Sequence, residues 1–321
     1  MLRIAHISDL HVLDWTGARP ADFASKRWTG ALNLLGSRRG KHPVAVAERL
    51  ADHLGARIAA GDIDHVIVSG DLTNLSLPGE FRRAREVIDR IGPRKRLTLV
   101  PGNHDVYTAA TARSRAFESH FADLCAADGV GAGWLREAGR DAWPVVRAPL
   151  DDVRIYGLCS AVPTPPFCAW GQVGPEQLVR LQTLVAAEPA TVRVRIVVLH
   201  HNLHRRGRVA EASARLLDRA AVAQAVRDID AHLVLHGHSH PPHQGHLAGG
   251  PGRPVIPVVG CGSSTWQRGG AHGGSYNVVE LRAEGVVGIR GYRAPATDGS
   301  YESDGLDLLA AALRPEAAIS C

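Results

Sequence analysis

Five short polar clusters, each placed directly after a run of apolar residues, constrain this chain more than any other feature. Apolar runs of four to eight residues rich in Val, Ile and Leu, separated by helix-like segments, predict buried strands of an α/β sheet. Ligands of open α/β sheets bind beyond the carboxyl ends of the strands, so we expect all five clusters to meet at one edge. The clusters are Asp9-Leu10-His11, Gly70-Asp71, Gly102-Asn103-His104-Asp105, His200-His201 and Gly237-His238-Ser239-His240.

These clusters offer carboxylate, imidazole and amide groups and no thiolate, a set that suits divalent Mn, Fe, Co, Ni or Zn. The plausible ligands outnumber the four of a typical zinc site. Two ions that share Asp71 as a bridge would use all of them, and such pairs clamp the attacking and leaving oxygens of a phosphoryl displacement. The candidate metal ligands are Asp9, His11, Asp71, Asn103, His200, His238 and His240.

The ordered motifs D-x-H, G-D, G-N-H-D, an apolar strand ending in His, and G-H-x-H resemble those of the calcineurin-like metallophosphoesterase superfamily. They span residues 9–240, about three quarters of the chain. The resemblance implies an α/β fold, a four-layer α/β/β/α sandwich of two mixed sheets flanked by helices. D-L-H at residues 9–11 and G-D-L-T-N at residues 70–74 are similar to the bacterial class III cyclic-nucleotide phosphodiesterase branch.

The resemblance also implies a role for each motif residue. His104 would face the substrate, where it stabilises the phosphoryl oxygens or protonates the leaving group, and Asp105 would orient its imidazole. A hydroxide held between two divalent ions (Mn, Fe or Zn) would be the nucleophile. The first ion would be held by Asp9, His11 and His240, the second by Asn103, His200 and His238, and both by Asp71.

The chain has 17 histidines, so several must have other roles. We expect His6 and His65, inside or beside strands, to pack or to form hydrogen bonds. His236 precedes the last motif and is expected to support the neighbouring ligands. Surface and substrate-contacting roles both stay open for His201, His204, His243 and His246.

The motifs lie within one predicted catalytic domain, residues 1–300, followed by a C-terminal tail at 301–321. Apolar runs near the end of this domain are expected to be antiparallel strands that close the second sheet. These runs lie at 255–260, 276–281 and 286–291. Helices between the motifs are expected near 43–60, 78–91, 109–127, 175–187 and 211–228.

Residues 19–41 form a basic insertion that is far longer than a simple strand-to-helix loop requires. It carries six basic residues and one acid, a balance that equals the net charge of +5 of the whole chain. Trp, Phe and Leu lie among these charges, which suits contact with an anionic membrane surface. A cap that attracts a polyanionic substrate is a second interpretation. A surface helix with a solvated basic face is the third.

Composition is that of a globular protein, with 45% hydrophobic and 21% charged residues. No apolar run approaches the roughly 18–20 residues of a membrane span, and no signal-peptide pattern precedes the first strand. The five cysteines show no metal-binding spacing. We therefore expect a cytoplasmic protein, with the insertion as its one candidate contact to the inner membrane face. The sequence carries no signal for an oligomeric state.

These observations predict a dinuclear metal-dependent phosphoesterase that hydrolyses small phosphodiesters. The alternative enzyme is a pyrophosphatase of a nucleotide-linked lipid, similar to UDP-diacylglucosamine hydrolases, because the insertion is both basic and apolar. A non-catalytic scaffold of the same fold would be expected to lose motif residues, and none is missing here. Aromatic residues make up only 5% of the chain and form no evident stacking platform, so there is no clear nucleic-acid signal.

Overall fold

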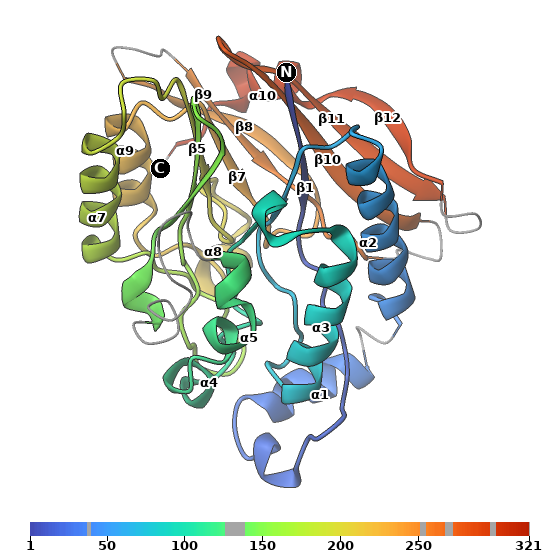
Figure 1. The fold of residues 1–321 in the computed structure, drawn as a ribbon. Coiled ribbons are helices and arrows are strands. Elements are labelled where there is room, and N and C mark those ends of the chain that lie inside the picture. Colours follow the sequence, from blue (N-terminus) through green and yellow to red (C-terminus); the bar gives the residue numbers. More distant parts are fainter. Residues whose placement is uncertain (37–39, 126–138, 251–254, 267–271, 296–299, 321) are drawn as a thin grey trace.

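Two mixed β-sheets pack against each other and carry helices on their outer faces (Figure 1). This arrangement confirms the predicted α/β sandwich. The computed structural model describes residues 1–36, 40–125, 139–250, 255–266, 272–295 and 300–320.

The first sheet joins strands from both ends of the chain. It contains β1 (Leu2–Ile7), β2 (His65–Val68), β3 (Leu97–Leu99), β10 (His272–Arg282), β11 (Gly285–Pro295) and β12 (Glu302–Asp307), in the order β12-β11-β10-β1-β2-β3. Strands β1, β2 and β3 are parallel, and β10 pairs antiparallel with the other edge of β1.

The second sheet is built mainly from the middle of the chain. It contains β4 (Val145–Leu150), β5 (Val153–Gly157), β6 (Val194–Val198), β7 (Leu233–His236), β8 (His243–Ala248) and β9 (Val255–Gly260), in the order β4-β5-β6-β7-β9-β8. Strands β5, β6, β7 and β9 are parallel.

The prediction for the three late apolar runs was wrong in its sheet assignment. Only residues 255–260 join the second sheet, as β9, and they pair parallel with β7. Residues 276–281 and 286–291 lie in β10 and β11 of the first sheet. The reason is that buried β1 has two edges, and the one not paired with β2 needs hydrogen-bond partners that β10 supplies.

Helices lie between the strands along the chain. They are α1 (Arg27–Leu35), α2 (Val44–Ala59), α3 (Pro78–Ile91), α4 (Ala109–Arg113), α5 (Ala116–Cys125), α7 (Pro175–Ala186), α8 (Arg208–Ser213), α9 (Arg219–Asp228) and α10 (Leu308–Ala312). In the part of the chain just described, every helix is too short or too polar to span a bilayer.

Two of the expected helices are interrupted. The helix expected at 109–127 splits into α4 and α5 because Arg115 takes a left-handed backbone angle, φ 51°. The helix expected at 211–228 is divided between the end of α8 (Arg208–Ser213) and α9 (Arg219–Asp228). Asp218, just before α9, accepts hydrogen bonds from the backbone N–H groups of Val173 and Gly174. These two hydrogen bonds position Asp218 so that the residues just before α9 do not continue the helix.

One core cluster lies between the two sheets and beneath the helices of the first half of the chain, and a second lies between the second sheet and helices α7 and α9. All four residues of β2 are buried, as expected for a parallel strand covered on both faces. Helix α2 buries Val46, Leu50 and Leu54 on one face, each contributing about 1.5–3 kcal/mol relative to exposure. Near the chain end, β12 pairs with β11, and α10 buries Leu308.

Candidate metal centre

The predicted ligands of the first ion lie together where the two sheets meet. Asp9 and His11 follow β1, and His240 follows β7. The Asp9 Oδ1 atom is 3.7 Å from His11 Nε2 and 3.8 Å from His240 Nε2. The other carboxylate oxygen of Asp9 accepts hydrogen bonds from the Ser8 hydroxyl and the His238 backbone N–H. Asp9 therefore has one oxygen anchored and one facing the two imidazoles.

The predicted ligands of the second ion form an adjacent group. The Asn103 Oδ1 atom is 3.2 Å from His200 Nε2 and 3.0 Å from His238 Nδ1. The remaining ring nitrogens donate to backbone carbonyls, His200 Nδ1 to Ser69 and His238 Nε2 to Ala214. In the neutral rings these outer contacts fix each tautomer, so that the nitrogen facing Asn103 carries the lone pair.

Asp71 lies between the two groups, as its predicted bridging role requires. Its Oδ2 atom is 3.8 Å from His11 Nε2 and 3.3 Å from His200 Nε2. Burial alone would lower the pKa of His200, but the facing Asp71 carboxylate raises it to about 9. Burial would conversely raise the pKa of Asp71, and the imidazoles of His200 and His104 hold it well below its usual range.

The backbone of the centre is strained at five of the seven predicted ligands. Their φ angles, between 47° and 69°, fall in the left-handed region that non-glycine residues rarely adopt. Such conformations cost about 1–3 kcal/mol each and persist where the surrounding structure enforces them, often at functional sites. The strained ligands are Asp9, His11, Asp71, His238 and His240.

Two glycines allow the close approach of these loops. A Cβ atom on Gly102 would lie 2.1 Å from Asp71 Oδ1, and one on Gly237 would lie 1.9 Å from the Ser8 hydroxyl oxygen. Side chains at either position would displace the buried carboxylates. Glycine at both positions is therefore a packing requirement of the centre.

The donor set fits cations. Within the described residues, Asp9 Oδ1 and both ring nitrogens of His11 are buried without a hydrogen-bond partner. Buried polar atoms of native proteins nearly always have a partner, so atoms of this kind that face one another indicate a ligand between them. Aspartate, asparagine and histidine groups match Mn, Fe or Zn.

His104 lies beside the centre, but Asp105 does not orient it as expected. The Nδ1 atom of His104 donates to the carbonyl oxygen of Asn74. The fully buried Asp105 carboxylate instead accepts backbone N–H groups of Gly102, Leu72 and Thr73. Those three donors occupy both carboxylate oxygens. Asp105 therefore holds the loop that carries His104, and the Asn74 carbonyl orients the ring.

Sequence reasoning missed His42, which directly follows the basic insertion. Its ring centroid is 4.6 Å from that of His11 and 5.7 Å from that of His240. These three residues offer nitrogen atoms that lie within 4.8 Å of one another. His42 follows no strand and belongs to no motif, so only the tertiary fold brings it to the centre.

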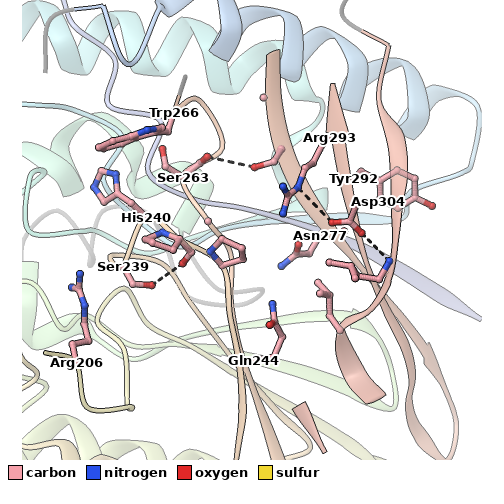
Figure 2. Close-up of a pocket in the computed structure, with 18 residues that line it drawn as sticks. Arg206, Ser239, His240, Gln244, Ser263, Trp266, Asn277, Tyr292, Arg293 and Asp304 are labelled. Atoms are coloured by element: carbon pink, nitrogen blue, oxygen red, sulfur yellow. Dashed lines mark hydrogen bonds and ion pairs between the residues drawn. The ribbon is translucent and has the colours of Figure 1, made fainter. Parts of the chain in front are cut away.

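Two cavities adjoin the centre. The first has a volume of about 590 Å³ and extends from His240 along β10–β12. Figure 2 shows Arg206, Ser239 and His240 at one end of this cavity and Arg293 and Asp304 at the other. Arg206 thus places a cation beside the predicted first ion.

The second cavity, about 520 Å³, lies at Asn103 and His104. Helix α1 of the insertion forms one of its walls through Trp28 and Leu32, and Lys26, just before the helix, also lines it. Burial lowers the pKa of Lys26 to about 8.

The insertion is held firmly against the catalytic loops, although residues 37–39 within it lie outside the described part. Arg27 is buried and donates to the carbonyl oxygens of Leu75 and Ser76. Lys26 donates to the Thr164 hydroxyl and the Cys168 carbonyl. These two basic side chains therefore point into the protein and do not form part of a solvated face.

Comparison with known proteins identifies the family of the chain and agrees with its fold. A sequence model described as calcineurin-like phosphoesterase matches residues 2–242. No curated protein sequence matches the chain. A dimetal phosphatase from Danio rerio has a similar structure, with a TM-score of 0.58 and 11% identity over 94% of this chain and 98% of that one. The purple acid phosphatase PPD1 from yellow lupin (Lupinus luteus) seeds has a TM-score of 0.55 and 11% identity, over 94% of this chain and 52% of that one.

Proposed function

The chain belongs to the calcineurin-like phosphoesterase family and is a metal-dependent phosphoester hydrolase, and on that premise we propose that it hydrolyses phosphodiesters at a dinuclear centre. One observation carries the choice of diesters. A cavity adjoins the centre at His240, and another adjoins it at Asn103 and His104. A phosphodiester has a substituent for each cavity, whereas a monoester would leave one of them unfilled.

In this proposal the seven predicted ligands hold two divalent ions, which when bound would supply Lewis-acid activation of water and of the phosphoryl group. The protein itself contributes orientation and charge. Arg206 in the first cavity and Lys26 in the second favour an anionic substrate. His104, oriented through Nδ1 by Asn74, would pass a proton from Nε2 to the leaving oxygen.

A second candidate is a pyrophosphatase of a nucleotide-linked lipid. The observation that favours it is the apolar lining of the second cavity, where Trp28 is 50% exposed, Leu32 61% and Phe167 79%. Large exposed apolar side chains next to a catalytic centre suit an acyl chain or a membrane surface. The same surface would give the insertion its proposed contact with anionic lipid.

The test is a substrate panel with metal-reconstituted protein. Bis-p-nitrophenyl phosphate should be hydrolysed with a kcat/KM at least about 10-fold above that for p-nitrophenyl phosphate, a difference of about 1.4 kcal/mol. Cyclic nucleotides and nucleoside diphosphate conjugates in the same panel distinguish the two candidates. A preference for the monoester would contradict both, and inactivity on every ester with both ions bound would indicate a scaffold.

A further inference from the structure

Three histidines form a second cluster, apart from the predicted metal centre. His204 lies in the loop after β6, His236 ends β7 and His243 begins β8. One ligand atom from each lies within 4.8 Å of the other two. The rings of His204 and His243 are stacked, with centroids 3.4 Å apart and an interplanar angle of 12°.

One ring nitrogen of each histidine in this cluster lacks a partner. Within the described residues, His204 Nδ1, His236 Nε2 and His243 Nδ1 are all buried without a hydrogen-bond partner. An unsatisfied buried polar atom typically costs about 1–3 kcal/mol. Three such atoms in one cluster indicate a common partner. A single cation would satisfy all three once one of the two stacked rings turns, because the lone pair of an imidazole lies in the plane of its ring.

The tautomer of His236 is already the one that binds metal. This ring is fully buried, and its Nδ1 atom is 3.0 Å from the carbonyl oxygen of Gly237. A carbonyl only accepts hydrogen bonds, so Nδ1 carries the hydrogen and Nε2 keeps its lone pair. Metal-binding histidines are usually fixed in this way by a backbone carbonyl or carboxylate.

The sheet leaves room for the rings at one position. Gly260 of β9 is paired with His236 of β7 on one side and with His243 of β8 on the other. Paired residues of neighbouring strands share a face, so both imidazoles stand on the face of Gly260. A Cβ atom there would lie 2.5 Å from Cε1 of His236. The glycine therefore makes the site possible.

We propose that His204, His236 and His243 bind a third divalent metal ion, of the zinc type, which acts as a structural clamp. Three neutral imidazoles are a ligand set that suits zinc, with nitrogens about 2.0–2.1 Å from the ion. His236 and His243 stand at the two ends of residues 237–242, the loop that carries His238 and His240. The ion would therefore fix the base of that loop, without taking part in hydrolysis.

The test is the zinc content of the full chain after reconstitution with Zn²⁺ and desalting. Wild type should hold about three ions per chain, and His243→Gln and His204→Gln about two each. His246→Gln is the matched control on β8, where Nδ1 contacts the Ala312 carbonyl, and it should keep all three. Equal zinc content in wild type and both cluster variants would overturn the proposal.

A second measurement separates this site from the dinuclear centre. Asp71→Asn should lose the ions of that centre and still hold about one zinc, and adding His243→Gln should remove it. With Co²⁺ in place of Zn²⁺, the Asp71→Asn protein should keep a visible absorption band that the double variant lacks. If Asp71→Asn keeps no ion and shows no band, the third site is wrong, whatever the fate of the dinuclear centre.

Discussion

The Asp71 carboxylate faces histidines of both ligand groups. It lies within 4 Å of His11 and of His200. Replacement by Asn removes the negative charge that offsets two cations while keeping the shape of the side chain. We expect Asp71→Asn to lose both ions of the centre and nearly all phosphoesterase activity. Elemental analysis with turnover on an aryl diester checks this, and two retained ions with normal turnover would contradict the bridging role.

His104 is not one of the seven predicted ligands, and the backbone carbonyl of Asn74 orients its ring through Nδ1. His104→Ala should therefore keep the metal content of wild type and lose about 10²–10⁴-fold in rate, the range of a positioned acid or base. The loss should be smaller for a good leaving group such as nitrophenolate. Equal losses on good and poor leaving groups would instead assign charge stabilisation to His104, and a loss of metal would make it a ligand.

For single residues, the sequence predicts which side chains belong to the site better than it predicts what each of them contacts. The motif residues do converge, because strand ends of parallel sheets meet at one edge. Asn74 and His42 were missed since their roles depend on a backbone carbonyl and on the path of the insertion. The orienting role expected of Asp105 was wrong for the same reason, as its carboxylate is saturated by loop N–H groups.

Helix α1 has two proposed roles, as a cap over the substrate and as a contact with lipid. Trp28 and Leu32 line the cavity at His104, whereas Leu35 is 67% exposed on the same helix and lines neither cavity. If α1 is a substrate cap, Trp28→Ala with Leu32→Ala should raise KM for nucleotide conjugates and leave a small aryl diester unchanged. Leu35→Ala is the matched control and should change neither value. If α1 contacts lipid, all three substitutions should weaken binding to anionic vesicles.

Strand β2 contains a buried histidine that makes stability depend on pH. Burial, with Arg147 and Arg96 nearby, lowers the pKa of His65 to about 3. Between about pH 6.5 and 3 the unfolded chain binds a proton there and the folded chain does not. The free energy of unfolding should therefore fall as pH drops, by about 1.4 kcal/mol per pH unit from this group.

Denaturant unfolding of His65→Gln at several pH values tests this contribution. The variant should show a shallower decline than wild type across that range. Thr98→Val removes the hydrogen-bond partner of His65 but keeps the titrating ring, so it should be less stable with an unchanged slope. Identical slopes in His65→Gln and wild type would contradict the assignment.

The periodicity of the sequence predicts where helices and strands lie better than it predicts which strands are paired. Helices α2, α3 and α7 lie close to their expected ranges because each has a proline near its start and one apolar face. The sheet membership of β10 and β11 depends on which strand edge is left unpaired, which is a property of the assembled fold.

Both sheets of the molecule contribute ligands to the predicted metal centre. Asp9, Asp71 and Asn103 come from loops after strands of the first sheet, and His200 and His238 from loops after strands of the second. Bound ions would thus join the two halves of the sandwich across their shared edge. No local pattern in the sequence shows this arrangement, although the order of the motifs makes it possible.

Removal of metal should therefore destabilise the entire fold in one step. A ligand at 1,000 times its Kd adds about 4 kcal/mol to the stability of a folded protein. For a chain of this size we expect chelation to lower Tm by several degrees while the thermal transition stays single. Differential scanning calorimetry with and without chelator measures the shift, and Asp71→Asn, already without the bridging carboxylate, should lose most of it. Two separate transitions in the chelated protein would show that the sheets unfold independently, and an unchanged Tm would show that metal does not join them.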